Sequence, residues 1–302
     1  MKPCVFIHTN HKQYVGAVVS MHSMRRNSPH ADKFDVKLIE YETHKDFFKK
    51  YEGREYNRDG DKRVWDPEDL QSFTPLRFMP PELMGYEGKA VVVDPDVFAI
   101  GDVWELLDRD MQGKAVMCRT RGTPPHFASS VMLLDCAKLK HWNLAKDFDT
   151  LFTGEREYKT WMNLGYEPKE NIGLIEPEWN DFDKLTPKTK MIHNTRRKTQ
   201  PWKSGLPVDF IPAEHNLLNP VMLLNRLRRK LFGTYAFLGA YKEHPDERQT
   251  QLFFAYLREC LENGLVSEAV VKEHMAANHV RHDAFDVIKR TPPVEQVLPK
   301  AA

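Results

Sequence analysis

One apolar run limits what this chain can fold into. Residues 89–103 read KAVVVDPDVFAIGDV, so three valines lead into Asp94-Pro95-Asp96 and a second apolar run follows. An unbroken apolar run of this kind is typical of a strand buried on both faces, as in a parallel sheet covered by helices. Pro95 has no N–H to give to a neighbouring strand, so we expect regular pairing to end there. The run therefore predicts a central strand whose carboxyl end carries two aspartates.

The two aspartates suggest a cation site. Open α/β sheets bind ligands at the carboxyl ends of their strands, and alternate residues of an extended chain point the same way. Two close carboxylates repel each other unless a cation lies between them, and oxygen ligands suit Mg²⁺ or Mn²⁺ shared with substrate phosphates. A solvated turn explains the same residues, because Asp and Pro are ordinary turn formers. Four apolar residues followed by Asp-x-Asp is also the nucleophile pattern of haloacid-dehalogenase-type phosphohydrolases.

Length and composition exclude several classes of protein. A chain of 302 residues can bury a large core, and its formal charge of +1 gives no electrostatic case for nucleic acid as a partner. The four cysteines are scattered without CxxC spacing, which argues against a zinc site or a disulfide framework and fits a reducing compartment. No apolar stretch has the length of a signal peptide core or a spanning helix. We therefore expect a cytoplasmic protein without a transmembrane segment, and a peripheral membrane contact stays open.

Apolar periodicity predicts alternating strands and helices. This order is the signature of a doubly wound sheet, so the predicted fold class is α/β, a mostly parallel sheet flanked by helices. Near residue 212 the pattern becomes helical, which predicts an α/β domain over residues 1–212 and a helical C-terminal region over 213–302. We expect strands over 4–8, 35–41, 114–119, 130–135, 172–176 and 190–194, and helices over 11–27, 43–51, 70–79, 102–110, 136–152, 217–232, 245–263 and 267–281.

Three further expectations concern less regular segments. The polar segment 52–69 is predicted to be a surface loop, and Pro80-Pro81 to stop the preceding helix. The last twelve residues are predicted to be a loose tail. The helix over 217–232 is basic and amphipathic, so it either lies on an anionic membrane surface or packs on the rest of the chain.

Four stretches, in order, resemble the family 8 glycosyltransferases, the glycogenin-like retaining enzymes with the GT-A fold. They cover much of residues 3–205 and read HTNHKQYVGAVVSMHSM, SFTPLRFMPPELMGYEGKAVVVDPDVFAIGDVWEL, EPEWNDF and MIHNTRRKTQPWKSG. The resemblance implies a metal-dependent hexosyltransferase with a GT-A fold. Such an enzyme moves a sugar from a nucleotide sugar, UDP-linked, to an acceptor hydroxyl with retained configuration. The acceptor stays open between a glycan, a lipid, a protein and a small molecule.

The resemblance also implies roles for particular residues. Asp94, Asp96 and His193 would hold Mn²⁺ or Mg²⁺, although a hydrogen-bonded histidine at a strand end is the plain alternative for His193. Residues of the opening segment would surround the uracil; local capping and core packing are their alternatives. The nucleotide contacts implied are Thr9, Asn10, Tyr14, Arg77, Lys198, Trp202 and Lys203, and Asn180 would touch donor or acceptor. Arg196 and Arg197 would belong to the same basic loop as Lys198.

One departure from the family concerns catalysis. The family's Asp-Gln pair is absent, because residues 158–163 read YKTWMN. We expect Glu157 to supply the missing carboxylate; the other outcome is that Lys159 meets an anionic group of the donor or acceptor. Two alternatives to a glycosyltransferase follow: a nucleotide-sugar-binding protein with little catalysis, and a phosphohydrolase with Asp94 as its nucleophile.

Overall fold

A six-stranded sheet forms the centre of the computed structural model, which describes residues 1–123, 125–210 and 237–299 together with residues 224, 227, 228, 231–233 and 235. The strand order is β2-β1-β5-β8-β7-β9. Three of the five neighbouring pairs are parallel, while β8 runs antiparallel to both β5 and β7. The predicted α/β class with a mostly parallel sheet is confirmed. The strands are β1 (Cys4–Thr9), β2 (Asp35–Glu40), β5 (Lys89–Val93), β7 (Val116–Arg121), β8 (His126–Asp135) and β9 (Ile172–Leu174).

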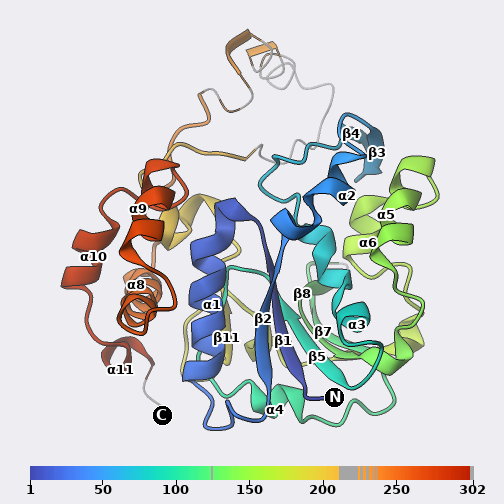
Figure 1. Ribbon diagram of the computed structural model, residues 1–302, viewed down its shortest axis with the longest axis horizontal. Coiled ribbons are helices and arrows are strands. Elements are labelled where there is room, and N and C mark those ends of the chain that lie inside the picture. Colours follow the sequence, from blue (N-terminus) through green and yellow to red (C-terminus); the bar gives the residue numbers. More distant parts are fainter. Residues whose placement is uncertain are drawn as a thin grey trace.

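Helices cover both faces of this sheet (Figure 1). Alternate side chains of a strand point to opposite faces, so Val5 and Ile7 join a core with α1 and α4, while Cys4 and Phe6 join the core with α5 and α6. The helices are α1 (Tyr14–Arg26), α2 (Lys45–Lys49), α3 (Pro80–Leu83), α4 (Trp104–Leu107), α5 (Leu144–Thr153) and α6 (Tyr158–Met162). Short 3₁₀ turns connect them, among them η1 (His11–Gln13), η2 (Tyr41–His44), η3 (Thr74–Phe78), η4 (Cys136–Lys138), η5 (Lys169–Asn171), η6 (Pro177–Asn180), η7 (Arg197–Thr199) and η8 (Pro201–Lys203).

The chain leaves the main sheet at the Asp-Pro-Asp turn. Asp94 N still bonds Ser130 O at 3.0 Å, and Val97 N then closes the turn on Asp94 O at 3.2 Å. Regular pairing ends at Pro95, as predicted, and β6 (Val97–Ala99) joins β11 (Met191–His193) and β10 (Asp181–Phe182) in a separate sheet. A Cβ on Gly16 of α1 would lie 3.1 Å from the Pro95 carbonyl oxygen, so a residue without a side chain lets α1 approach the turn closely.

Two local predictions were wrong. Segment 52–69 contains a β-hairpin, β3 (Glu55–Arg58) and β4 (Asp61–Val64), instead of a loop. Its tight turn needs two residues with positive φ, and Asp59 and Gly60 supply them at 58° and 81°. Of the predicted helix over 70–79 only the 3₁₀ turn η3 (Thr74–Phe78) forms. It ends before Pro80, but Pro80 also begins α3, since proline fits the first helical turn, where its missing N–H has no partner to lose.

In the described part of the C-terminal region, four helices pack on the α/β unit: α8 (Glu247–Glu262), α9 (Glu268–Ala276), α10 (Ala284–Arg290) and α11 (Val294–Val297). Helix α8 shares a buried core with α1, and Val294 and Val297 are buried in it, so the prediction of a loose tail was wrong for this segment. Most of the predicted helix over 217–232, and the predicted boundary near 212, lie outside the described residues. Among the described helices, none has the length and apolar character needed to cross a membrane.

The junction between α1 and α8 is held by a partly buried carboxylate, and we expect it to stabilise the fold. Glu259 accepts hydrogen bonds from Arg26 Nε at 2.7 Å and from His22 Nε2 at 2.6 Å. Burial would raise the pKa of Glu259, but these two partners outweigh it and hold the pKa below its usual value. Glu259→Gln should therefore lower the free energy of unfolding by about 2 kcal/mol at pH 7.

The sign of the pH dependence follows from the lowered pKa. The ionised form is favoured by folding, so its contribution is present above the unfolded pKa of about 4.3 and is lost as the pH falls through the folded value. Urea unfolding of both proteins at pH 7 and at pH 4 and below measures this. A difference between them that stays constant down to acid pH would contradict an ionised Glu259 as its source.

Candidate functional site

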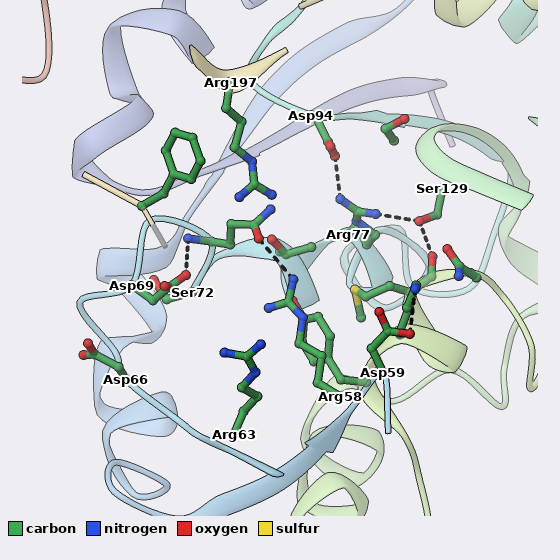
Figure 2. A pocket seen from close by; sticks show the side chains of 18 of the residues that line it. Arg58, Asp59, Arg63, Asp66, Asp69, Ser72, Arg77, Asp94, Ser129 and Arg197 are labelled. Atoms are coloured by element: carbon green, nitrogen blue, oxygen red, sulfur yellow. Dashed lines mark hydrogen bonds and ion pairs between the residues drawn. The ribbon is translucent and has the colours of Figure 1, made fainter. Parts of the chain in front are cut away.

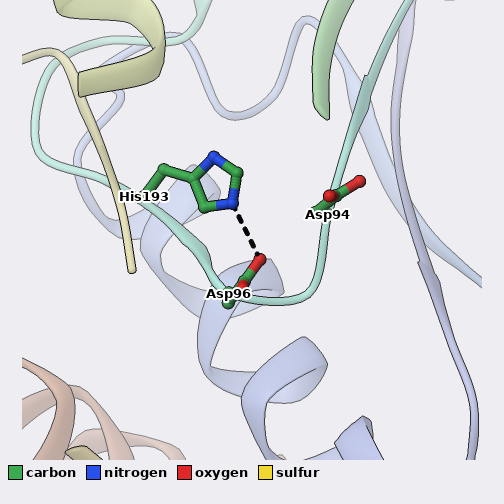
Figure 3. A group of neighbouring side chains, drawn as sticks. All are labelled: Asp94, Asp96 and His193. Carbon is green, nitrogen blue, oxygen red and sulfur yellow. Dashed lines mark ion pairs between the residues drawn. The ribbon is translucent and has the colours of Figure 1, made fainter. Parts of the chain in front are cut away.

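Two strand ends and the separate sheet bring three side chains together. Asp94, Asp96 and His193 each offer a ligand atom, and these atoms lie within 4.8 Å of one another (Figure 3). The antiparallel register of β6 and β11 places His193 opposite Val97, beside Asp96. Carboxylate oxygens with one imidazole nitrogen form a donor set that suits Mn²⁺ or Mg²⁺. The predicted group of three is thus brought together by the fold.

The orientation of His193 favours a cation. His193 Nδ1 is 2.9 Å from Asn180 Oδ1, and Asn180 Nδ2 in turn donates to Ser130 Oγ at 2.9 Å. With the amide placed this way Nδ1 carries the proton, and Nε2 faces Asp96 Oδ1 at 3.2 Å. A neutral imidazole would present its lone pair to a carboxylate there, so a proton or a metal ion has to lie between them. Burial would lower the pKa of His193, but the charges of Asp96 and Asp94 outweigh it and raise the pKa.

Arg77 and His8 contact the Asp94 carboxylate. Its Oδ1 accepts from Arg77 Nη2 at 2.8 Å and lies 3.1 Å from His8 Nε2, and no hydrogen bond among the described residues ends on Oδ2. Both ring nitrogens of the buried His8 lack a hydrogen bond of good geometry. Burial would raise the pKa of Asp94, but the Arg77 charge and His8 hold it well below the usual range. Asp94 is therefore ionised at neutral pH, with one oxygen left for a cation.

Two residues of this arrangement were missed from the sequence. His8 follows Ile7, which pairs with Val93 in the parallel register of β1 and β5, so the strand pairing itself places His8 beside Asp94. Gln200 donates from Nε2 to Asp96 Oδ2 at 3.0 Å and so fixes the second carboxylate. No local sequence signal indicates Gln200, because this contact depends on how the loop after β11 folds back.

The group of three opens into a large cavity of about 1820 Å³. Its wall also contains Arg77, whose Nη1 donates to Ser129 Oγ at 2.5 Å, and Arg58 and Arg63 of the hairpin β3–β4 (Figure 2). The predicted basic loop lines the cavity through Arg196, Arg197 and Lys198. A cavity with carboxylates, a histidine and several cations fits a substrate that carries phosphates.

Other predicted nucleotide contacts do not line this cavity. Asn10 is buried, accepts from Gln13 N at 3.2 Å and caps the turn η1, and Thr9 is buried beside it. Tyr14 stacks on His274 with ring centroids 5.7 Å apart. Trp202 packs on Phe253, and Lys203 pairs with Asp209 at 2.7 Å. Contact of these five residues with a nucleotide stays a prediction.

Two predicted catalytic residues have other partners in the structure. Glu157 lies outside the cavity lining and caps α6: its carboxylate accepts from Thr160 N at 2.6 Å, Thr160 Oγ1 at 2.7 Å and Asp59 N at 2.6 Å. Both oxygens of Glu157 are engaged in these hydrogen bonds, and its role as a substitute for the missing Asp-Gln pair stays a prediction. Asn180 is fully buried, accepts from His193 Nδ1 and is not part of the cavity lining, so its contact with donor or acceptor stays a prediction.

We expect Asn180 to be a positioning residue for the cation site. Asn180→Ala frees His193 to rotate, and losing such an outer partner typically weakens metal binding 10- to 100-fold. Calorimetric titration of Mn²⁺ in the presence of UDP measures this. Ser130→Ala removes the next hydrogen bond, from Asn180 Nδ2 to Ser130 Oγ, and should have a smaller effect on Mn²⁺ binding. An unchanged Mn²⁺ affinity in Asn180→Ala would exclude the positioning role.

Comparison with known proteins gives only distant likenesses. No protein-family model and no curated protein matches the chain. Among solved structures, the bifunctional glycosyltransferase WbbM is 13% identical with a TM-score of 0.47, covering 66% of this chain and 46% of its own. The glycosyltransferase GlyE of Streptococcus pneumoniae TIGR4 is 14% identical with a TM-score of 0.47, covering 88% and 64%. The galactosyltransferase LgtC, solved with donor and acceptor sugar analogs, is 11% identical with a TM-score of 0.47, covering 66% and 89%.

The chain thus spans less than two thirds of the first two of these structures. Likenesses this distant, with TM-scores below 0.5, carry no argument about activity. The activity has to be argued from the residues of the cavity.

Proposed function

We propose that the chain is a metal-dependent glycosyltransferase that moves a hexose from a nucleotide diphosphate sugar, UDP-linked, to an acceptor hydroxyl with retention. The observation that carries the proposal is the convergence of Asp94, Asp96 and His193 at one end of a large cavity whose wall holds several cationic side chains, among them Arg197 and Lys198. Paired carboxylates with a histidine suit a divalent cation, and guanidinium groups suit phosphate oxygens.

Different residues would have different roles in such a transfer. Asp94, Asp96 and His193 would hold the cation, which when bound neutralises the diphosphate and makes it a better leaving group. Arg197 and Lys198 line the same cavity and would bind the phosphate oxygens. The bond from the sugar C1 to the phosphate oxygen breaks, a bond from C1 to the acceptor oxygen forms, and the acceptor proton leaves with the diphosphate.

A panel of nucleotide sugars tests the proposal. Thermal shift is measured with Mn²⁺ and with chelator; a ligand at 100 times its Kd stabilises the folded state by about 2.7 kcal/mol. Release of free nucleotide in the presence of candidate acceptors supports transfer. Binding without release would support a nucleotide-sugar-binding protein, and phosphate release from simple phosphoesters would support a phosphohydrolase. If no nucleotide sugar stabilises the chain with Mn²⁺, the proposal fails.

A further inference from the structure

Three arginines from the hairpin and the basic loop face the cavity beyond the group of three. Arg58 ends β3, Arg63 lies in β4 and Arg197 begins η7, and all three line the cavity. Figure 2 shows their guanidinium groups directed into it, with Arg63 on the opposite side of the view from Asp94. Within the described part of the chain, none of the three forms an ion pair with a carboxylate, unlike Arg77 with Asp94.

These guanidinium groups are held in place without being neutralised. Arg58 lies over the Tyr158 ring at 4.8 Å and donates from Nη2 to Gln71 Oε1 at 3.3 Å. Arg197 lies over the Phe210 ring at 5.4 Å; burial and then the nearby charge of Arg58 lower its pKa, and the charges of Asp69 and Asp96 offset this only in part. Nε of Arg63 is buried and has no hydrogen-bond partner among the residues that the structure describes. Buried donors without partners are costly, so an anion in this space would be stabilised.

The acidic residues of the cavity do not offset these charges by direct contact. Asp66 accepts from Glu68 N at 2.9 Å and Asp69 from Gln71 N at 2.7 Å, so both carboxylates bond the backbone of their own loop. Lys159 pairs with Asp59 at 2.7 Å and thereby joins the hairpin turn to α6. The arginines remain the groups available to a ligand at this end.

The cavity has room for more than one substrate. Sites for a single small molecule measure about 300–1,000 Å³, and this cavity reaches about 1820 Å³. A diphosphate bound beside Asp94 and Asp96 would occupy the end where Arg77 lies. Arg58 and Arg63 belong to the hairpin at the other end, so they are left for a second ligand.

We propose that the hairpin end of the cavity binds an anionic group, a carboxylate or a phosphate, on the acceptor substrate. The inference rests on the proposed function, since it assigns the acceptor of that transfer. Planar guanidinium groups bind both kinds of anion through two parallel hydrogen bonds, and the placement of Arg58 over the Tyr158 ring reduces the entropy lost on binding.

Calorimetry on the full chain tests this in two steps. UDP with Mn²⁺ is titrated first; glucose 6-phosphate, glucuronate and uncharged glucose are then titrated into the saturated complex. We expect at least one charged probe to bind about tenfold or more tighter than glucose. Arg58→Gln and Arg63→Gln should each reduce that preference about tenfold, the loss of one charge-assisted pair. The matched control Arg290→Gln, on the exposed end of α10, should leave it unchanged.

Each outcome separates the two proposals. Failure of UDP to bind with Mn²⁺ would contradict the proposed function. Normal UDP binding with equal affinity for charged and uncharged probes, or with wild-type preference in both arginine variants, would overturn the anionic acceptor alone. A comparison of UDP-glucuronate with UDP-glucose tests whether the anionic group belongs to the donor sugar. If Arg58→Gln and Arg63→Gln weaken only the binding of UDP-glucuronate, the anion belongs to the donor sugar and the acceptor assignment is wrong.

Discussion

Replacing Asp96 by Asn should abolish most of the Mn²⁺-dependent affinity for UDP while leaving the fold intact. Asp96 contacts His193 Nε2 through Oδ1 and Gln200 Nε2 through Oδ2, so an amide of the same shape keeps the packing but removes the charge. The Oε1 atom of Gln200 is buried, has no partner within the described part of the chain and can accept from the new amide. Losing an outer partner of a metal ligand costs 10- to 100-fold, and losing a charged ligand should cost at least about 100-fold.

Asp94→Asn should weaken binding to a similar extent, with an added cost in stability because Arg77 loses its charged partner. Calorimetric titration of UDP with Mn²⁺, repeated with chelator, measures the affinity, and melting temperatures check the fold. Asp32→Asn, at an exposed position before β2 and outside the cavity, is the control and should match the wild type. Wild-type affinity in both variants would rule out the metal site.

The central strand and its aspartates could be predicted because their cause is local. Three consecutive valines before Asp94-Pro95-Asp96 need burial on both faces, and the proline ends the pairing whatever the rest of the chain does. The observed β5, the turn and β6 follow that prediction closely. His8 needed one further step, since it becomes a neighbour of Asp94 only once β1 is paired with β5.

The hairpin was missed although its turn carried a signal. Asp59-Gly60 is one of the strongest dipeptide signals for a tight hairpin turn. The two strands that flank this turn, however, carry polar residues on both faces. Of the eight strand residues only Tyr56 is buried, so the apolar alternation that marks a strand is absent. From the sequence alone, the arginines of the hairpin would therefore be assigned to the solvated surface, whereas in the structure they line the cavity.

Glu157 illustrates a second limit of prediction from sequence, which concerns the direction of a side chain. Proximity in sequence to the missing Asp-Gln pair suggested a catalytic carboxylate, whereas the structure uses Glu157 to cap α6 and to hold the hairpin turn through Asp59 N. Sequence distance gives no direction to a side chain. The direction here is set by the helix start, where free N–H groups attract a carboxylate.

Arg77→Met should lower the free energy of unfolding by about 3–5 kcal/mol, because it leaves the partly buried Asp94 carboxylate without its cation. Arg77 is 7% exposed and joins Asp94 to Ser129, so it links the end of β5 to β8. The Arg77 charge contributes to the lowered pKa of Asp94, so the contribution of the pair is fully present at neutral pH. It should begin to decline below about pH 4 as the unfolded carboxyl protonates.

Urea unfolding at pH 7 and at pH 3 measures this contribution, and UDP titration with Mn²⁺ measures the effect on the site. Arg77→Lys keeps the charge but cannot bond Asp94 and Ser129 together, so it should recover part of the stability. Arg121→Met is the matched control: Arg121 lines the same cavity but is exposed, and such a change usually costs within about 0.5 kcal/mol. If Arg77→Met is as stable as Arg121→Met at pH 7, Asp94 does not depend on Arg77, and the ionised carboxylate needed for a cation must be maintained by another group.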